Sequence, residues 1–306
     1  MRIALIGRTE ILYETAQALI GYGHSIVIII TAKEAPENSK NSSDFALLAK
    51  KLKIPFASSH NIECFRNDLI ETKPEIGISM NYTGIISQSI IDLFKFGILN
   101  AHGGDLPRYR GNACQAWAII NGEKKIGLCI HKMIGEEIDS GDIIARDFLD
   151  ISDQTKIADV WHWMQKKVPL LFKEALKKLE INCEYVLETQ SKSPKKVLRC
   201  YPRRPEDGLI NWRLSSVEIL RLINASSEPF SGAYCQFEAE KIIIWDASLI
   251  DEQEIFFAVP GQITFLGDGF IEVACGAGKL RVNSIEIGNY RGDPRKIIKS
   301  IRSRFV

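Results

Sequence analysis

The sequence lacks the long apolar run from which a membrane-spanning helix is built. Such a helix needs about 20 consecutive apolar residues, whereas the longest apolar stretch here, at 25–30, has only the length of a strand. The first residues, MRIALIG, begin a strand directly and do not have the shape of a signal peptide. We therefore expect a cytoplasmic protein without a membrane partner.

A second absence is an excess of charge of either sign. The 39 Lys and Arg residues nearly balance the 38 Asp and Glu residues, which gives a net charge of +1. Long-range attraction to nucleic acid or to an anionic membrane therefore receives no support from the composition. The hydrophobic fraction of 45% and the charged fraction of 25% are typical of a globular protein. A length of 306 residues predicts one large domain or two modest ones.

Closely spaced cysteines are also missing. The seven cysteines are scattered along the chain, and no two of them form a CxxC pair. An odd number without close pairs argues against a disulfide framework and against a zinc site. We therefore expect free thiols in a reducing compartment, and no metal.

The first predicted turn lacks the glycine-rich GxGxxG motif. Strands at 2–7 and 25–30 flank a helix at 11–22, and the second strand is almost wholly apolar, as expected for a parallel strand covered on both faces. The turn after the first strand reads Gly-Arg-Thr-Glu. This argues against a dinucleotide site, but the β-α-β layout still predicts a doubly wound sheet.

The remaining pattern divides the chain in two. We expect a Rossmann-like, doubly wound α/β domain at 1–190, a linker at 191–204 and an OB-like β-barrel domain at 205–306. The linker region, TQSKSPKKVLRCYPRRPEDG, has three prolines, many basic residues and no periodicity. Five short strands with turns rich in Gly, Asp and Asn favour a small barrel. A helix is expected over 294–304.

Polar residues that could perform chemistry gather between 98 and 144. Asn100 and His102 end a short apolar strand, and the alternation of a strand points their side chains the same way. Asp139 lies in a loop with a serine and a glycine. The three residues could be an ordinary hydrogen-bonded core cluster, but they also fit a base held by a carboxylate, with an amide donor for an oxyanion. No Ser or Cys stands in a nucleophile motif, so we expect acyl transfer without a covalent intermediate.

These motifs together resemble the folate-dependent formyltransferase family, which includes methionyl-tRNA, glycinamide ribonucleotide and sugar N-formyltransferases. Residues 100–102 match the family's Asn-x-His, 106–111 its Leu-Pro-x-Tyr-Arg-Gly, and 139–141 its Asp-x-Gly. A further match at 205–208, Pro-Glu-Asp-Gly, extends the resemblance over nearly the whole chain. One departure is Asp105, which adds a negative charge where relatives commonly have leucine.

The resemblance implies that 10-formyltetrahydrofolate is the formyl donor. It also implies that Asn100 donates a hydrogen bond to the developing oxyanion, while Asp139 orients His102, which relays a proton. The pterin is expected against two loops, with an asparagine nearby. The implied folate-binding residues are Gly84, Ile85, Ile86, Asn112, Ile134, Gly135, Glu136, Glu137, Ile138 and Asp139. The other histidines, including His131 on the strand that leads to the Asp139 loop, are expected to be structural.

The acceptor is predicted from the loop at 33–44. Relatives that modify tRNA generally carry a basic insertion there, whereas this loop has two Lys against two Glu and one Asp. We therefore expect a small amino-sugar nucleotide, with a 4-amino-4-deoxy sugar, and no nucleic-acid partner. By resemblance, this implies a role in lipopolysaccharide or O-antigen biosynthesis, and a homodimer is possible. Candidate ligands for the phosphates are Arg108, Arg203 and Arg204.

Three alternatives stay open at this point. The first is a methionyl-tRNA formyltransferase, which the length and the second domain would fit. The second is a formyltetrahydrofolate hydrolase, with water as the acceptor. The third is a binding module without catalysis, which would have no need for the Asn100, His102 and Asp139 set.

Overall fold

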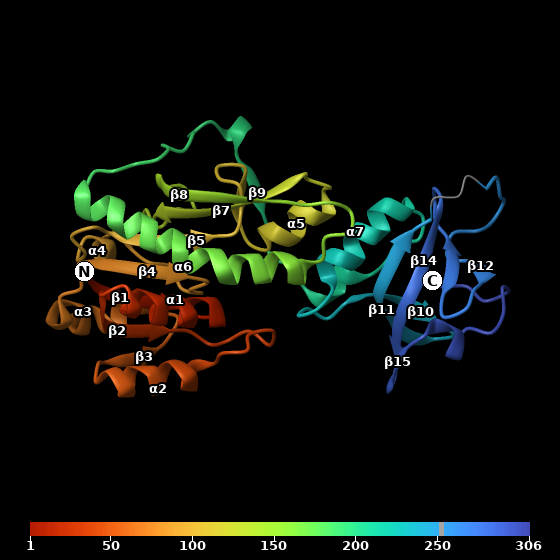
Figure 1. The fold of residues 1–306 in the computed structure, drawn as a ribbon, viewed down its shortest axis with the longest axis horizontal. Helices are drawn as coiled ribbons and strands as arrows, with labels where there is room; N and C mark the ends of the chain where they lie inside the picture. Colours follow the sequence, from red (N-terminus) through yellow and green to blue (C-terminus); the bar gives the residue numbers. More distant parts are fainter. Residues whose placement is uncertain (251–253) are drawn as a thin grey trace. The chain divides into compact units, whose positions relative to one another are not determined.

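The structure is a computed structural model, and it describes residues 1–250 and 254–306. These residues form two compact units (Figure 1). The linker expected at 191–204 stays a prediction, which limited proteolysis would test. The first unit comprises Met1–Cys114, Ile126–Leu149 and Trp161–Tyr201, and the second comprises Gln115–Lys125, Asp150–Val160 and Pro202–Val306.

The first unit is built on a sheet in the order β3-β2-β1-β4-β5-β7-β8. The strands from β1 to β5 pair in parallel, and β7 runs antiparallel to β5. This order confirms the doubly wound α/β class, in which ligands bind beyond the carboxyl ends of the parallel strands. The strands are β1 (Arg2–Gly7), β2 (Ser25–Thr31), β3 (Phe56–Ser58), β4 (Ile76–Met80), β5 (Ile98–His102), β7 (Lys125–Lys132) and β8 (Ile143–Asp150).

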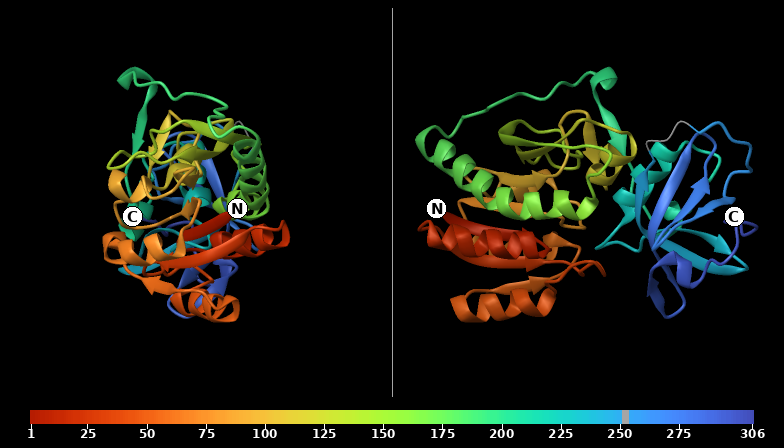
Figure 2. Two further views of the ribbon diagram at one scale, coloured as in Figure 1. Left: turned by 90° about the vertical axis from the view of Figure 1, so that its left-hand side faces the viewer. Right: turned by 45° about the vertical axis from the view of Figure 1, so that its right-hand side comes forward.

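Helices cover both faces of this sheet because its strands are apolar on both sides. Trp161 Nε1 in α6 donates to Glu10 Oε1 in α1 at 2.6 Å, and both helices lie on one side of the sheet (Figure 2). The other face packs against α3 and α4. The helices of this unit are α1 (Glu10–Gly21), α2 (Ser42–Leu52), η1 (Ile62–Phe65), α3 (Arg66–Thr72), α4 (Gln88–Ile91) and most of α6 (Ile157–Ile181), whereas all but the first residue of α5 (Cys114–Ile120) belongs to the second unit.

A two-stranded parallel ribbon joins β6 (Tyr109–Gly111) to β9 (Leu198–Cys200), with Arg110 opposite Arg199. The expected linker therefore contains a strand, preceded by the short turn η2 (Pro194–Lys196). A strand of three residues is too short for its alternation to be recognised in the sequence.

The second unit is an antiparallel sheet in the order β10-β11-β14-β13-β12, with β15 paired to β14, and α7 packs its apolar face against it. This confirms the expected antiparallel β domain. The elements are η3 (Pro205–Gly208), α7 (Ser216–Ser226), β10 (Ala233–Phe237), β11 (Glu240–Leu249), β12 (Ile263–Leu266), β13 (Ile271–Ala274), β14 (Lys279–Ile287), β15 (Tyr290–Gly292) and η4 (Pro294–Lys296).

The prediction of a helix over 294–304 is wrong. The chain makes only the single turn η4 and then extends, so that Phe305 N donates to Gly261 O at 2.8 Å. Phe305 is 1% exposed and belongs to the core of this unit, which favours an extended end over a surface helix. In the described residues, no helix has both the length and the hydropathy that crossing a bilayer demands.

Candidate functional site

Asp139 is the centre of a polar cluster at the end of β5. Its Oδ2 accepts the N–H of Gly111 at 2.9 Å and lies 3.4 Å from His102 Nδ1. Its Oδ1 lies 3.4 Å from His131 Nε2. Only 15% of the Asp139 side chain is exposed, so these groups replace water around the carboxylate. One carboxylate thereby connects β5, β6 and β7.

Asn100 reaches the same cluster through His131. The two residues are partners in the β5–β7 register, and Asn100 Nδ2 lies 3.3 Å from His131 Nε2. His131 Nδ1 lies 2.9 Å from the carbonyl of Lys132, which can only accept, so this nitrogen carries a proton. When His131 is neutral, its Nε2 accepts one Asn100 N–H; when the ring is protonated, the same nitrogen donates to Asp139 Oδ1, 3.4 Å away. The second N–H of the amide can serve an oxyanion.

His131 is a member of this cluster that the sequence analysis did not place there. It was expected to be structural, but it is 2% exposed and contacts both Asn100 and Asp139. Its position on the strand that leads to the Asp139 loop was the only signal in the sequence. The cross-strand register, which the sequence does not contain, brings it opposite Asn100.

His102 is held by both of its ring nitrogens. Nε2 lies 2.6 Å from the carbonyl of Tyr109, so it donates there, and Nδ1 faces the Asp139 carboxylate. The side chain is 8% exposed. The ring plane is thus set by β6 on one side and by the Asp139 loop on the other, as an orienting carboxylate requires.

The surroundings of Asp139 favour its charged form. Burial by itself would raise the pKa of this carboxyl, but the charges of His102 and His131 and the hydrogen bonds from His131 and Gly111 hold the pKa well below its usual range. The backbone of Asp139 is left-handed, with φ at +49°. Such a conformation costs a non-glycine residue on the order of 1–3 kcal/mol, and it persists only where neighbouring contacts impose it.

The structure brings together the two loops expected to bind folate. The Glu136 N–H donates to Ile86 O at 3.4 Å, and the Gly135 N–H donates to Gln88 Oε1 at 2.9 Å. A Cβ at Gly135 would come within 2.2 Å of Gln88 N, so only glycine allows this approach. Three isoleucines of these loops present apolar surface, with Ile85 79%, Ile134 38% and Ile138 50% exposed.

Three other residues expected to bind folate make contacts of a different kind. Gly84 packs against the chain at His60, where a Cβ would come within 1.9 Å of the carbonyl oxygen. Asn112 is exposed, and its N–H donates to Cys200 O at 3.1 Å, which continues the ribbon rather than joining the two loops. Glu137 accepts the hydroxyl of Ser140 at 2.5 Å.

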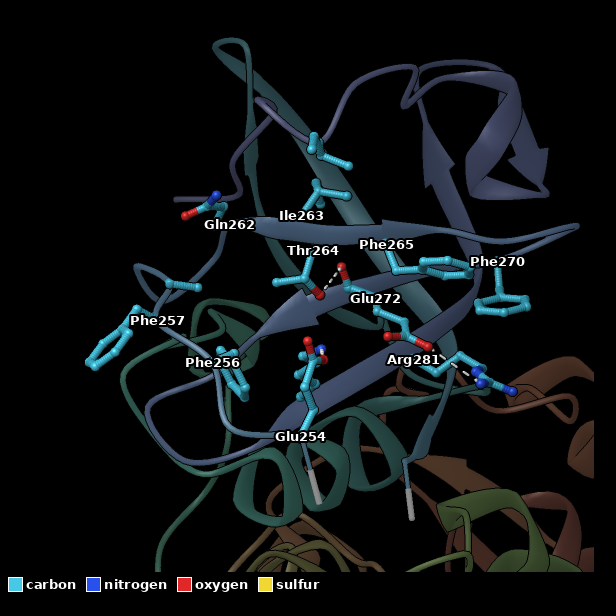
Figure 3. Close-up of a pocket in the computed structure, with 13 residues that line it drawn as sticks. Glu254, Phe256, Phe257, Gln262, Ile263, Thr264, Phe265, Phe270, Glu272 and Arg281 are labelled. Atoms are coloured by element: carbon cyan, nitrogen blue, oxygen red, sulfur yellow. Dashed lines mark hydrogen bonds and ion pairs between the residues drawn. The ribbon is translucent and has the colours of Figure 1, made fainter. Parts of the chain in front are cut away.

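A separate pocket of about 430 Å³ lies in the second unit (Figure 3). Its walls include Phe265 and Phe270, with the Arg281 guanidinium 4.1 Å from the centre of the Phe270 ring. Arg281 Nη2 also lies 3.4 Å from Glu272 Oε1. None of its lining residues is among those predicted for folate binding or catalysis.

Known proteins resemble the chain over nearly all of its length. Residues 1–176 match the family model described as Formyl transferase, and 203–301 match the Formyl transferase C-terminal domain. A methionyl-tRNA formyltransferase of Acetivibrio thermocellus is 26% identical in an alignment of 305 residues, gaps included, that covers 95% of this chain and 93% of that protein.

Solved structures of similar fold include two kinds of protein. An N-formyltransferase from Helicobacter canadensis, in complex with folinic acid and dTDP-3-aminofucose, has a TM-score of 0.68 at 18% identity, over 92% of this chain and 98% of that one. HypX from Aquifex aeolicus has a TM-score of 0.62 at 18% identity, over 98% of this chain. The chain spans about half of HypX, with 49% of that chain covered.

Proposed function

Because the chain belongs to the folate-dependent formyltransferase family, we propose that it moves the formyl group of 10-formyltetrahydrofolate to the amine of a nucleotide-linked 4-amino-4-deoxy sugar. Formation of a cell-surface polysaccharide is the process that this reaction would serve. The observation that carries the choice of acceptor is the loop at 33–44.

One of the two lysines of this loop, Lys40, is paired within the loop. Lys40 Nζ lies 3.3 Å from Asp44 Oδ1, and it also lies over the ring of Tyr13 at 5.1 Å. The loop backbone is tied down as well, since Ser39 N donates to Glu10 Oε2 at 3.2 Å. Binding tRNA requires several cations that can neutralise phosphates. A near-neutral loop in which Lys40 is already paired supports a small acceptor instead.

The acceptor class also has support from a relative. The Helicobacter canadensis N-formyltransferase was solved with dTDP-3-aminofucose, and its fold matches this chain over 98% of its own length. A sugar nucleotide carries two phosphates, which a few guanidinium groups can bind through paired hydrogen bonds.

Arg199 is the best-placed candidate for that role. It lies on the β6–β9 ribbon, and its guanidinium packs closely against Gly111: a Cβ at Gly111 would be 2.9 Å from Arg199 Nη1. The N–H of Gly111 in turn binds the Asp139 carboxylate. Arg203 was expected to contact phosphate, but its Nη2 donates to Ser226 Oγ and to Asp207 O, both at 3.1 Å, within the second unit. It therefore serves the scaffold.

The residues of the two loops fit a bound folate. The exposed side chains of Ile85, Ile134 and Ile138 suit an aromatic ring system, and peptide groups beside them suit its polar edge. When bound, 10-formyltetrahydrofolate supplies a formyl carbon that an amine can attack. No residue of the chain needs to form a covalent bond in this reaction.

The cluster around Asp139 then has three tasks. The N–H of Asn100 that His131 does not engage stabilises the oxyanion that develops on the formyl oxygen. His102 Nε2 keeps its proton on the Tyr109 carbonyl, so Nδ1, beside the Asp139 carboxylate, takes the proton that the acceptor amine loses as the new C–N bond forms. The same proton leaves toward the folate nitrogen when the old C–N bond breaks, so the site is unchanged after turnover.

Methionyl-tRNA formyltransferase is the second candidate. The relative from Acetivibrio thermocellus favours it, as does the basic segment at 192–199. Lys192, Lys195 and Lys196 are all exposed there.

The test is turnover with 10-formyltetrahydrofolate on nucleotide-linked 4-amino and 3-amino sugars and on methionyl-tRNA, across a salt series. We expect formylation of an amino sugar with a weak dependence on salt. Transfer to methionyl-tRNA that falls steeply with salt, with no sugar accepted, would favour the second candidate. Release of formate at the same rate without any acceptor would identify a hydrolase instead.

A further inference from the structure

Gln190 is a buried polar residue for which neither the sequence nor the family models give a role. It follows α6 in the chain, between the stretches matched by the two models, 1–176 and 203–301. Its exposure is 4%. An amide buried to this extent needs hydrogen-bond partners for both of its ends.

The partners of Gln190 use its full capacity. Its Oε1 accepts from Arg110 Nε at 3.2 Å and from Nη2 at 2.7 Å. Its Nε2 donates to the carbonyl oxygens of Asp139 at 2.9 Å and Gly141 at 2.6 Å. An amide has two acceptor sites and two N–H groups, so all four are occupied. A guanidinium only donates and a carbonyl only accepts, and therefore only this orientation of the amide satisfies every partner.

These contacts fix the two segments that one further hydrogen bond joins. Gly111 donates its N–H to the carboxylate of Asp139, and Arg110 precedes Gly111 in β6. Gln190 binds the Arg110 side chain on one side and the Asp139 backbone on the other. Asp139 adopts its left-handed conformation at the same point, with φ at +49°. A conformation of this kind persists where neighbours impose it.

We propose that Gln190 is the positioning residue that keeps Asp139 in its left-handed backbone and its carboxylate on His102 and His131. The inference rests on the proposed function only in assigning formyl transfer to Asp139. The hydrogen bonds of Gln190 to Arg110, Asp139 and Gly141 form a clamp on the Asp139 loop. The effect of this clamp on the loop can be measured without an acceptor.

Two variants of Gln190 separate its functions. Gln190→Met keeps the length of the side chain but removes all four hydrogen bonds, whereas Gln190→Glu keeps the acceptors for Arg110 and loses the donors to the two carbonyls. Gln165→Met is the matched control, because Gln165 Nε2 makes a 2.7 Å hydrogen bond to Glu14 in the same unit.

We expect kcat to fall about 100-fold in both Gln190 variants, because a catalytic group misplaced by about 1 Å loses roughly that factor. KM for folate and for the acceptor should change by less than about 3-fold, since the hydrogen bonds of Gln190 go to Arg110 and to the Asp139 and Gly141 carbonyls, and not to the exposed isoleucines of the folate loops. Hydrogen exchange of the 134–142 loop, followed by mass spectrometry, should become faster in both variants. The control should match the wild type in every measurement.

Wild-type kcat in Gln190→Glu, or unchanged exchange of the loop in a folded Gln190 variant, overturns the proposal. A rise in KM at constant kcat also overturns it. If the wild type itself formylates no acceptor, the proposed function fails, and loop exchange in the two variants still decides whether Gln190 is the clamp.

Discussion

Two carboxylates with little exposed surface, Asp139 in the first unit and Glu272 in the second, are held in different ways. Asp139 contacts His102, His131 and the N–H of Gly111, and its loop is strained. Glu272 lies in a regular strand, and its side chain has an ion pair with Arg281 at 3.4 Å. The glutamate borders the open pocket of Figure 3, yet the aspartate has the environment of a catalytic group. A hollow alone therefore does not indicate where chemistry occurs.

The largest expected effect separates these two carboxylates directly. Asp139→Asn and Glu272→Gln each remove one charge with little change in shape. Asp139→Asn should lower kcat at least about 100-fold, because His102 loses the group that orients it for proton transfer. Glu272→Gln should leave kcat within about 2-fold. Steady-state kinetics at saturating donor and acceptor measure both.

His102→Ala extends the same comparison. It should lower kcat by a similar factor of about 100, while a fluorescence titration should show folate binding close to that of the wild type, since the folate loops lie elsewhere. Near wild-type turnover in either Asp139→Asn or His102→Ala would remove the catalytic assignment.

A smaller effect is expected at His131. His131→Gln keeps a polar side chain but changes the partner that fixes the Asn100 amide, so kcat should fall by about 10-fold, which is less than the loss of an acid or base. His162, an exposed residue of α6, provides the control, and His162→Gln should leave kcat unchanged. Equal rates in both variants would return His131 to a purely structural role.

Strand alternation and loop composition were sufficient to predict three members of the cluster. Asn100 and His102 are two residues apart on β5, and Asp139 stands in a loop with a neighbouring glycine. Local patterns of this kind depend on near neighbours in the chain. The α/β class and the antiparallel second domain were predictable for the same reason, because hydrophobic periodicity is local.

The parts that could not be predicted depend on contacts between distant segments. His131 joins the cluster only through the β5–β7 register, and a slip of one residue would turn it to the other face. Gln190 and Arg199 come from a segment with no periodicity of its own. The extended end of the chain follows from the burial of Phe305 in a core that its local sequence does not specify.

The smallest expected effect is on stability in acid. A carboxyl whose pKa is lowered on folding contributes stability that is complete above its unfolded pKa of about 3.9 and is lost as pH falls toward the folded pKa. The pKa of Asp139 lies well below its usual range, since the charges of His102 and His131 outweigh burial. The difference in unfolding free energy between the wild type and Asp139→Asn should therefore be present in full at about pH 5 and shrink below about pH 4.

Urea unfolding at each pH, with pulsed hydrogen exchange of peptides from β1 and β4, reports on the first unit alone. Glu272→Gln keeps Asp139, so its curve should follow that of the wild type in these peptides. Asp139 also stays ionised above pH 5. If kcat falls with decreasing pH in that range, the fall is therefore due to protonation of another group. A difference that shrinks near pH 6 instead would mean that the carboxylate is not stabilised by its neighbours in the way that its contacts indicate.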